Sequence, residues 1–551
     1  MTVYTLVLLE VSGIQDYIFS SNHLAQNIGA SELVYRSTTE WVEEVLNSLA
    51  LQHNYHWNDN GMPVYDGAGL LGGTGDVEVA YAGGGNAMLL FGDAKNARSF
   101  ISRITRKALE DAPGMNLVAI MQEVDWHSQA LSQRHQQIRG ALAEKKHSRA
   151  FSMPLAGLGV TAQCVYTGMP AVGWDNDPKL VGAEEAERSV RLRKNPRLVS
   201  AEVAAKLRTQ IRGRQRLAQA LPRVEAEDLK FAYNFDDFVA KGESSYIAVI
   251  HADGNKMGKR FEAVIRACPA PQDNQSYVEQ LRALSRSVQD AASSALQETV
   301  DYLLSAREVL AKELKIEKTH ILPFRPIVFG GDDVTFVSEG RIGLALAARY
   351  LQAFSGKKLA DDKTATARAG IAIVKSHYPF ARAYQLAEKL AKSAKIAIPE
   401  RKEDEESATC VMDWHISTTG VIDSLDKVLQ REYVSSSGHP LRMRPLRVLP
   451  VRKGSRIWQR WDVLTGLLHA FGEDEAWAGK RNKLKALRDA LRGEARMVEL
   501  FRANYRLDEL PPIDDLDDMK ISGWQHGWCG YFDALEALDF YISLEPSNNK
   551  G

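Results

Sequence analysis

Apolar and polar positions in the middle of the chain switch between strand and helix patterns. "YIAVIHAD" (246–253) is a short apolar run that ends in an acid, and apolar side chains recur at spacings of three and four from about 276 to 314. We therefore expect a buried strand followed by an amphipathic helix. Next come a strand at about 322–329, the turn "GGDD", the strand "VTFVS", a helix near 344–354 and the strand "ARAGIAIV". The predicted order of elements is βαββαβ.

The N-terminal part of the chain repeats this order. It contains the strand "TLVLLEVS" (5–12), a helix at about 29–50, the strand "VEVAYA", the turn "GGGN" (83–86), the strand "AMLLF", a helix at about 94–111 and the strand "NLVAIMQEV". A fixed order that recurs in one chain predicts two related domains. Since βαββαβ is the split βαβ order of ferredoxin-like domains, including polymerase palms, we expect an α+β protein with two palms.

The two copies differ in their acidic residues. Setting "YAGGGNAMLL" against "VFGGDDVTFV" places Gly85 opposite Asp332 and Asn86 opposite Asp333. Setting "LLEVSG" against "IHADG" places Ser12 opposite Asp253. This alignment gives the second copy three acids at its turn and the first copy none.

The length of 551 residues is too great for one ordinary hydrophobic core. We expect a first palm-like domain at 1–130, an inserted domain at 131–243, a second palm at 244–420 and a helical domain at 421–551. Gly/Pro-rich stretches such as "TGMPAVGWDNDP" mark the inserted domain, and "WDVLTGLLHAFG" and "KRNKLKALRDALRGEARMVELFRANY" are the clearest helices of the last part.

Composition narrows the class of protein. The hydrophobic fraction of 45% and the charged fraction of 25% are those of a soluble globular protein. No apolar run approaches the roughly 18 residues of a membrane span, and the start "MTVYTLVLLEVSG" lacks the features of a signal peptide, so we expect no membrane association and a cytoplasmic location. Four cysteines without a CxxC pair argue against disulfides and a zinc ribbon and favour buried free thiols.

Charge is balanced overall but concentrated in one place. The net charge of −1 argues against a globally basic nucleic-acid binder. Between Arg188 and Arg216, however, there are ten Lys/Arg residues and one acid, Glu202. This basic stretch is either a solvated helix face or a surface that binds RNA or a protein partner through residues such as Arg191, Arg193, Lys194 and Arg197.

The second palm places its three acids at one spot. In the βαββαβ arrangement the first strand is a neighbour of the central hairpin, so Asp253 is expected to meet Asp332 and Asp333. Carboxylates this close repel one another, and a divalent cation removes that cost. Oxygen ligands suit Mg²⁺ or Mn²⁺. Two such ions about 3.5–4 Å apart would activate a 3′-hydroxyl and stabilise a leaving pyrophosphate.

The glycines beside the acids fit the same chemistry. Gly330 and Gly331 permit positive φ in a tight turn and keep side chains clear of a triphosphate, and Gly254 follows Asp253 in the facing loop. Turns also favour acids and glycines for purely structural reasons. The third acid, at the end of the predicted first strand, favours the metal site over that structural interpretation.

Four stretches of this sequence resemble a known family. They are "SGIQDYIFSSNHLAQNIGASELVY" (12–35), "HADGNKMGKRF", "FGGDDVTFV" and "HYPFARAYQLAEKLAKSAK" (377–395). Together they resemble the large palm-domain subunit of type III CRISPR effector complexes, which carries two palms and makes cyclic oligoadenylates from ATP. The similar stretches lie in both palms, which make up roughly half of the chain.

This resemblance implies roles for particular residues. Asp253, Asp332 and Asp333 would be metal ligands for two Mg²⁺ or Mn²⁺ ions, and Lys395 would bind triphosphate as a point charge, although a solvated helix lysine explains Lys395 as well. The implied substrates are nucleoside triphosphates, ATP above all. The implied partners are guide or target RNA and other effector subunits, and whether the protein forms an oligomer stays open.

The sequence also departs from the family pattern. The family often has DGD in the first loop, whereas this chain has "DGN" with Asn255. It begins at the first palm strand and has no His-Asp dipeptide, so we expect no DNA cleavage by a histidine–aspartate nuclease domain. The zinc-binding cysteines of some relatives are also absent. A stand-alone nucleotide cyclase therefore stays open beside a subunit of a CRISPR complex.

Three functions compete. The leading hypothesis is a nucleotidyltransferase that joins nucleoside triphosphates 3′–5′ and cyclises the product, with the first palm holding the acceptor nucleotide. Ser12 and Asn86 would hydrogen-bond that nucleotide or serve only as turn residues. The alternatives are a scaffold subunit for RNA or protein partners, which the three acids argue against, and a GGDEF-type cyclic dinucleotide synthase, whose turn would end in Glu-Phe rather than Asp-Val.

Overall fold

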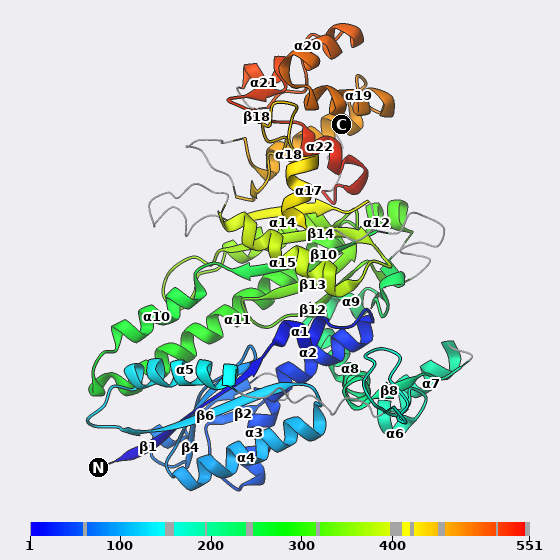
Figure 1. Ribbon diagram of the computed structural model, residues 1–551. Helices are drawn as coiled ribbons and strands as arrows, with labels where there is room; N and C mark the ends of the chain where they lie inside the picture. The colour runs from blue at the N-terminus through cyan, green and yellow to red at the C-terminus, as the bar shows by residue number, and fades with distance from the viewer. Residues whose placement is uncertain are drawn as a thin grey trace.

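The α+β class is confirmed. The structure is a computed structural model that describes residues 2–58, 63–148, 159–192, 195–238, 246–315, 320–396, 410–418, 424–449, 458–513 and 516–545. In Figure 1 the sheet of the second palm lies between the N-terminal strands and helices at one end of the molecule and the C-terminal helices at the other.

The first palm (residues 3–125) has the predicted βαββαβ order. Its sheet has the strand order β4-β5-β1-β6, and neighbouring strands are antiparallel. The predicted helix at about 29–50 is two helices, because the hydroxyls of Ser37 and Thr39 donate to the carbonyls of Val34 and Tyr35 where the first one ends. The elements are β1 (Val3–Ser12), α1 (Ile14–Phe19), α2 (Leu24–Ser37), α3 (Glu40–Ser48), the hairpin of β2 (Tyr55–Trp57) and β3 (Pro63–Tyr65), β4 (Val77–Gly83), β5 (Asn86–Phe91), α4 (Ala94–Asp111) and β6 (Asn116–Asp125).

The second palm (residues 246–375) repeats this order around a larger sheet. The strand order is β12-β13-β10-β14-β15-β16, in which β15 runs parallel to β14. A short helix after the first strand, α10, was not predicted. The elements are β10 (Tyr246–Gly254), α10 (Met257–Ala267), α11 (Asn274–Ser305), α12 (Arg307–Leu314), β12 (Phe324–Val328), β13 (Val334–Glu339), α14 (Gly343–Ser355) and β14 (Ala367–Lys375), followed by α15 (Phe380–Ile396), β15 (Val411–Ile416) and β16 (Leu446–Arg447).

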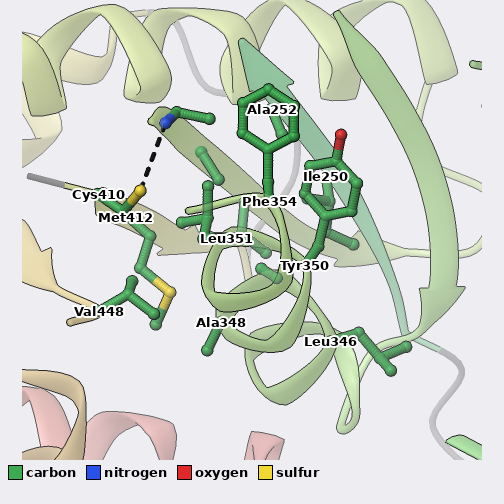
Figure 2. Packing of buried hydrophobic residues seen from close by; sticks show 14 of the residues in the cluster. Ile250, Ala252, Leu346, Ala348, Tyr350, Leu351, Phe354, Cys410, Met412 and Val448 are labelled. Carbon is green, nitrogen blue, oxygen red and sulfur yellow. Dashed lines mark hydrogen bonds between the residues drawn. The ribbon is translucent and has the colours of Figure 1, made fainter. Parts of the chain in front are cut away.

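Helix α14 covers one face of the second sheet. Figure 2 shows Tyr350, Leu351 and Phe354 of this helix packed with Ile250 and Ala252 of β10. These side chains are almost completely buried. Burial of large apolar groups on this face stabilises β10, the strand that carries Asp253.

Two helices lie between the palms. In Figure 1, α5 (Leu131–Ser148) and α11 separate the first sheet from the second. Leu6 and Leu8 of β1 share one hydrophobic cluster with Leu281 and Leu284 of α11. The two palms are therefore joined through a common core, and their turns can face one another across it.

The inserted segment (residues 159–238) is attached to the first palm by one long helix, α8 (Ala201–Ala220). This helix packs tightly along α2. A Cβ atom on Gly29 would lie 1.7 Å from the carbonyl oxygen of Lys206, and one on Gly213 would lie 2.9 Å from Cγ2 of Ile28. Glycine is thus required on both helices for this close approach. The segment also contains β7 (Ala171–Trp174), α6 (Pro178–Val181), α7 (Ala183–Leu192), β8 (Leu198–Ser200), α9 (Arg223–Ala226) and β9 (Lys230–Phe231).

The C-terminal part is mostly helical, as predicted. The longest helix predicted for this C-terminal part is divided at Gly493 into α19 (Arg481–Arg492) and α20 (Glu494–Tyr505). The other elements are α17 (Leu425–Glu432), α18 (Trp461–Glu473), α21 (Asp517–Ser522), β17 (Trp524–Gln525), β18 (Trp528–Cys529) and α22 (Phe532–Ala537). We retain the four domain boundaries of the sequence analysis as a proposal.

Two expectations from composition can be compared with the structure. Cys164, Cys268, Cys410 and Cys529 are all buried and free, which confirms the predicted buried thiols. Among the described helices, none combines the length and apolar character needed to cross a bilayer.

Candidate metal centre and nucleotide site

The three predicted acids come together in the second palm. Asp253 lies at the end of β10, and Asp332 and Asp333 lie in the turn between β12 and β13. One carboxylate oxygen from each lies within 4.8 Å of the others. At an effective dielectric constant near 20, each pair of charges at this separation repels by on the order of 3 kcal/mol. The cluster therefore has the oxygen donors and the excess negative charge of a divalent-cation site.

Strand register produces this arrangement. Ala252 of β10 is paired with Val334 of β13, so Asp253 lies beside Asp333. The N–H of Gly254 donates to the carbonyl of Asp332 at 3.2 Å. A Cβ on Gly254 would lie 3.0 Å from Cβ of Asp332, which is closer than Cβ atoms normally approach. Glycine at this position is what lets the loop and the turn meet.

The turn itself leaves free space beside the acids. Gly330 has φ of +101°, a backbone conformation that favours glycine. A Cβ built on Gly331 would have no atom within 4 Å. Gly330 thus has the positive φ expected of it and Gly331 does not, and the space beside Gly331 can admit phosphate groups.

One cation already faces the acids. Arg368 of β14 is the cross-strand partner of Asp253, and its Nη2 forms an ion pair with Oδ2 of Asp253. Its Nη1 donates to Oδ1 of Asn255 at 3.1 Å. The sequence analysis missed Arg368. The sequence feature that could have indicated Arg368 is its place as the single arginine near the start of the otherwise apolar stretch "ARAGIAIV".

One positive charge does not offset three carboxylates. Burial, and then the charge of Asp253, raise the pKa of Asp332 to about 6. Loss of hydration in the crowded turn, followed by the charges of Asp332 and Asp253, raises the pKa of Asp333 well above its usual value, although this side chain keeps contact with solvent. Without a cation the cluster therefore holds protons at higher pH than isolated carboxylates do, and protons compete with metal for the same oxygens.

A cavity of about 290 Å³ adjoins the acids and lies between the two palms. The hairpin turns of both palms line it, through Gly83, Gly84 and Asn86 on one side and Gly330, Gly331 and Asp332 on the other. Its remaining wall combines apolar side chains, such as Phe261, Ile265, Leu281 and Val288, with polar ones, such as Glu10, Arg139, Ser285 and Gln289. A cavity with both kinds of side chain suits a nucleotide, whose base and phosphates need different surroundings.

The structure corrects the predicted alignment of the first palm. Glu10, not Ser12, is paired with Asn86, and the N–H of Val11 donates to the carbonyl of Gly85 at 2.8 Å, as Gly254 donates to Asp332. Glu10 therefore occupies the position of Asp253. Ser12 lies two residues further along, is paired with Asn116 and does not line the cavity. The sequence comparison matched the glycines after the two strands and so shifted the register by two residues.

The first palm consequently has one acid at its turn, where none was predicted. Glu10 lines the cavity and forms an ion pair with Lys146 of α5. A helix outside the βαββαβ core thus neutralises Glu10, much as Arg368 neutralises Asp253. Gly85 and Asn86 occupy the positions in the first palm that correspond to Asp332 and Asp333 in the second, as predicted.

Lys395 lies in the last turn of α15, and its side chain is outside the described part of the structure. Its predicted role in binding triphosphate stays a prediction.

In the described part of the basic stretch, Arg191 and Arg197 are exposed, whereas two other residues are engaged in contacts inside the protein. Lys206 is buried, and its Nζ donates to Glu202 at 2.6 Å and to the carbonyl of Tyr17 at 2.7 Å. Nε of Arg216 contacts Glu32 at 2.7 Å. These two residues therefore belong neither to a solvated helix face nor to an RNA-binding surface. Arg193 and Lys194 lie outside the described residues.

Comparison with known proteins agrees with this geometry. Residues 246–403 match the family model described as Cas10/Cmr2, second palm domain. By this match, these residues form a palm of the Cas10/Cmr2 family. The predicted resemblance to the palm subunit of type III CRISPR complexes is confirmed. None of the curated protein sequences matches this chain significantly.

Solved structures of the palm subunits share the fold of nearly the whole chain. A type III-B Cmr-beta structure in the apo state aligns with 98% of this chain and 81% of its own at 10% identity and a TM-score of 0.51. An apo Csm1–Csm4 cassette aligns with 98% and 69% at 12% identity and a TM-score of 0.53. A Csm1–Csm4 cassette in complex with pppApA aligns with 98% and 70% at 14% identity and a TM-score of 0.51. At these identities the likeness shows the fold.

Proposed function

We propose that this protein is a metal-dependent nucleotidyltransferase that joins ATP molecules 3′–5′ and cyclises the product to cyclic oligoadenylate in antiviral defence. One observation carries the proposal. Asp253, Asp332 and Asp333 converge beside a glycine turn that shares a cavity with the turn of the first palm.

The residues present fit two divalent cations. Asp253, Asp332 and Asp333 supply carboxylate oxygens, and burial together with their mutual repulsion raises the pKa of Asp332 and Asp333, a cost that bound cations would relieve. They would hold Mg²⁺ or Mn²⁺. When bound, such ions activate a 3′-hydroxyl and stabilise the charge of a leaving pyrophosphate.

The chain itself binds and orients the two nucleotides. Gly330 and Gly331 leave room for the triphosphate of the donor nucleotide, Gly254 lets the loop of Asp253 approach their turn, and the apolar side chains of the cavity receive a base. Asn86 at the turn of the first palm offers its amide to the acceptor nucleotide. The acceptor's 3′ oxygen forms a bond to the donor's α-phosphorus, the bond to the β-phosphate breaks, and pyrophosphate leaves.

The ligands of structurally similar proteins support adenine as the base. Csm1–Csm4 cassettes are described in complex with pppApA and with the cyclic product cA4. For this chain we propose the same kind of substrate, together with a Csm4-like subunit, guide or target RNA, an oligomeric assembly and a location in the cytoplasm.

Product analysis tests the proposal. The purified protein, alone and with partner subunits and target RNA, is incubated with each of the four nucleoside triphosphates and Mg²⁺ or Mn²⁺, and the products are identified by mass spectrometry. We expect cyclic oligoadenylate from ATP. Absence of any phosphodiester product under both conditions overturns the proposal and leaves a scaffold role.

A further inference from the structure

Arg216, the last residue of the basic stretch, reaches the catalytic turn. It lies on α8 of the inserted segment, yet its guanidinium carbon is 4.0 Å from the ring centroid of Tyr35 on α2 and 4.0 Å from that of Phe329. Phe329 directly precedes Gly330. The guanidinium is therefore held between the first palm and the turn of the second.

A buried carboxylate fixes the orientation of this guanidinium. Nε of Arg216 donates to Oε2 of Glu32 at 2.7 Å, and the Glu32 side chain is only 2% exposed. The Arg216 side chain keeps 18% exposure. Within the described part of the chain, Glu32 is its hydrogen-bond partner and uses Nε alone. The Nη1 and Nη2 donors are thus left for a ligand.

These donors stand where phosphate groups would lie. The nearest atom to a Cβ built on Gly330 is Nη1 of Arg216, at 3.9 Å, and a Cβ on Gly331 would meet no atom within 4 Å. Arg216 does not line the 290 Å³ cavity. The Gly330–Gly331 turn therefore lines the cavity and also lies close to the guanidinium of Arg216.

We infer that Arg216 binds the triphosphate of the nucleotide substrate at the Gly330–Gly331 turn. The inference rests on the proposed function and assigns a phosphate-binding residue to the inserted segment, outside both palms. A planar guanidinium pre-oriented by Glu32 and two rings offers its remaining donors as a fixed fork, which matches the geometry of phosphate oxygens. Little side-chain freedom is left to lose when the nucleotide binds.

Equilibrium binding tests this inference without turnover. The full-length protein is titrated with ATP in the presence of Ca²⁺, and separately with adenosine, which has the same base and no phosphate. The variants are Arg216→Gln, Arg216→Lys and the double variant Glu32→Gln/Arg216→Gln, which leaves no unpaired buried carboxylate if the single variant folds poorly. Arg212→Gln is the matched control, because Arg212 is exposed and lies one turn earlier on α8.

We expect Arg216→Gln and the double variant to bind ATP about tenfold or more weakly, since charged hydrogen bonds are lost. Arg216→Lys should fall between them and the wild type, because it keeps the charge but not the fork. Arg212→Gln should stay within about twofold of the wild type, and adenosine affinity should be the same for all variants.

Two results overturn the inference. ATP affinity that is unchanged in Arg216→Gln and in the double variant would show that no phosphate is bound there. Equal losses of ATP and adenosine affinity would show that Arg216 only clamps the turn. The proposed function is judged separately: if the wild type binds ATP through Arg216 but forms no product, that function fails while this inference stands. If product forms and Arg216→Gln binds ATP normally, the reverse holds.

Discussion

Asp253 and Arg368 face each other on neighbouring strands, so the Asp253 carboxylate is held in place before any cation binds. An amide at position 253 would be a poor ligand for Mg²⁺ and would lose most of its attraction to Arg368. We expect Asp253→Asn to lower the rate of phosphodiester formation by about 100-fold or more, in line with the loss of a metal-held transition state.

Turnover at a series of Mg²⁺ concentrations checks this expectation. Asp362→Asn serves as the control, because Asp362 is exposed, is not one of the three clustered acids and has φ of 59°, which asparagine also adopts. Near-normal turnover of Asp253→Asn at low Mg²⁺ would mean that the chemistry lies elsewhere.

The acid pair in the turn makes stability depend on pH. The pKa of Asp332 is raised to about 6 and that of Asp333 is also raised, so the folded protein without metal binds more protons than the unfolded chain. This contribution to stability is present at low pH and is lost as pH rises through about 6. We expect the melting temperature of the metal-free wild type to fall between pH 5 and pH 7.5 by more than that of Asp332→Asn.

Adding Mg²⁺ at pH 7.5 should restore the wild type more than Asp332→Asn, because the cation replaces the lost protons. Thermal unfolding in both buffers, with and without Mg²⁺, measures both effects. An identical pH response in the two proteins would contradict the raised pKa of Asp332.

At the level of single residues, the sequence could predict the acids but not their neighbours. Asp253, Asp332 and Asp333 were found because they end or interrupt apolar strands at positions that the βαββαβ order brings together. The roles of Glu10 and Arg368 depend on strand register, since a shift of one or two residues changes the cross-strand partner. Arg216 depends on a tertiary contact between helices that lie far apart in the sequence.

The contact between α2 and α8 determines where the inserted segment meets the Gly330–Gly331 turn. A Cβ at position 29 would lie 1.7 Å from the backbone of Lys206, so Gly29→Ala must push the helices apart. We expect a loss of about 1–3 kcal/mol of unfolding free energy from overpacking, and a weaker hold of Arg216 on the turn.

Gly140→Ala is a control for which we expect the free energy of unfolding to rise rather than fall. Gly140 lies within α5, and a Cβ there would meet no atom within 4 Å. Alanine should stabilise this helix by about 0.5–1 kcal/mol. Denaturant unfolding of both variants measures the difference, and a neutral Gly29→Ala would show that α2 and α8 are not in close contact.

Element order was easier to predict than element ends. The periodic patterns gave both palms, but the break between α2 and α3, the separate helix α10 and the division of α19 from α20 were missed. These features arise from local hydrogen bonds, such as those of Ser37 and Thr39, and from packing between the palms. Hydrophobic periodicity carries little information about either.

In the whole molecule, a buried arginine joins the C-terminal helices to the second palm. Nε of Arg444 lies 3.3 Å from Oδ1 of Asp413 on β15, and its Nη1 lies 3.1 Å from Oε2 of Glu536 on α22. Its side chain is fully buried, so Arg444→Met leaves buried carboxylates without their partner. We expect a loss of about 3–5 kcal/mol of stability and early proteolytic release of the C-terminal helices.

Arg481→Met is the control, because Arg481 is 80% exposed and its ion pair with Asp539 lies on the surface. Thermal unfolding and limited proteolysis of the two variants check the expectation. Equal behaviour of both variants would show that Arg444 does not anchor this part of the protein.

We propose that one catalytic centre lies in the second palm and that the first palm only binds a nucleotide. Mass spectrometry of the products that Asp332→Ala/Asp333→Ala and Ser12→Ala form from ATP and Mg²⁺ tests this division of roles. We expect no phosphodiester product from the double variant, with an intact fold because carboxylate repulsion is relieved, and normal product from Ser12→Ala. Normal product from a well-folded Asp332→Ala/Asp333→Ala variant would contradict the assignment of the metal centre.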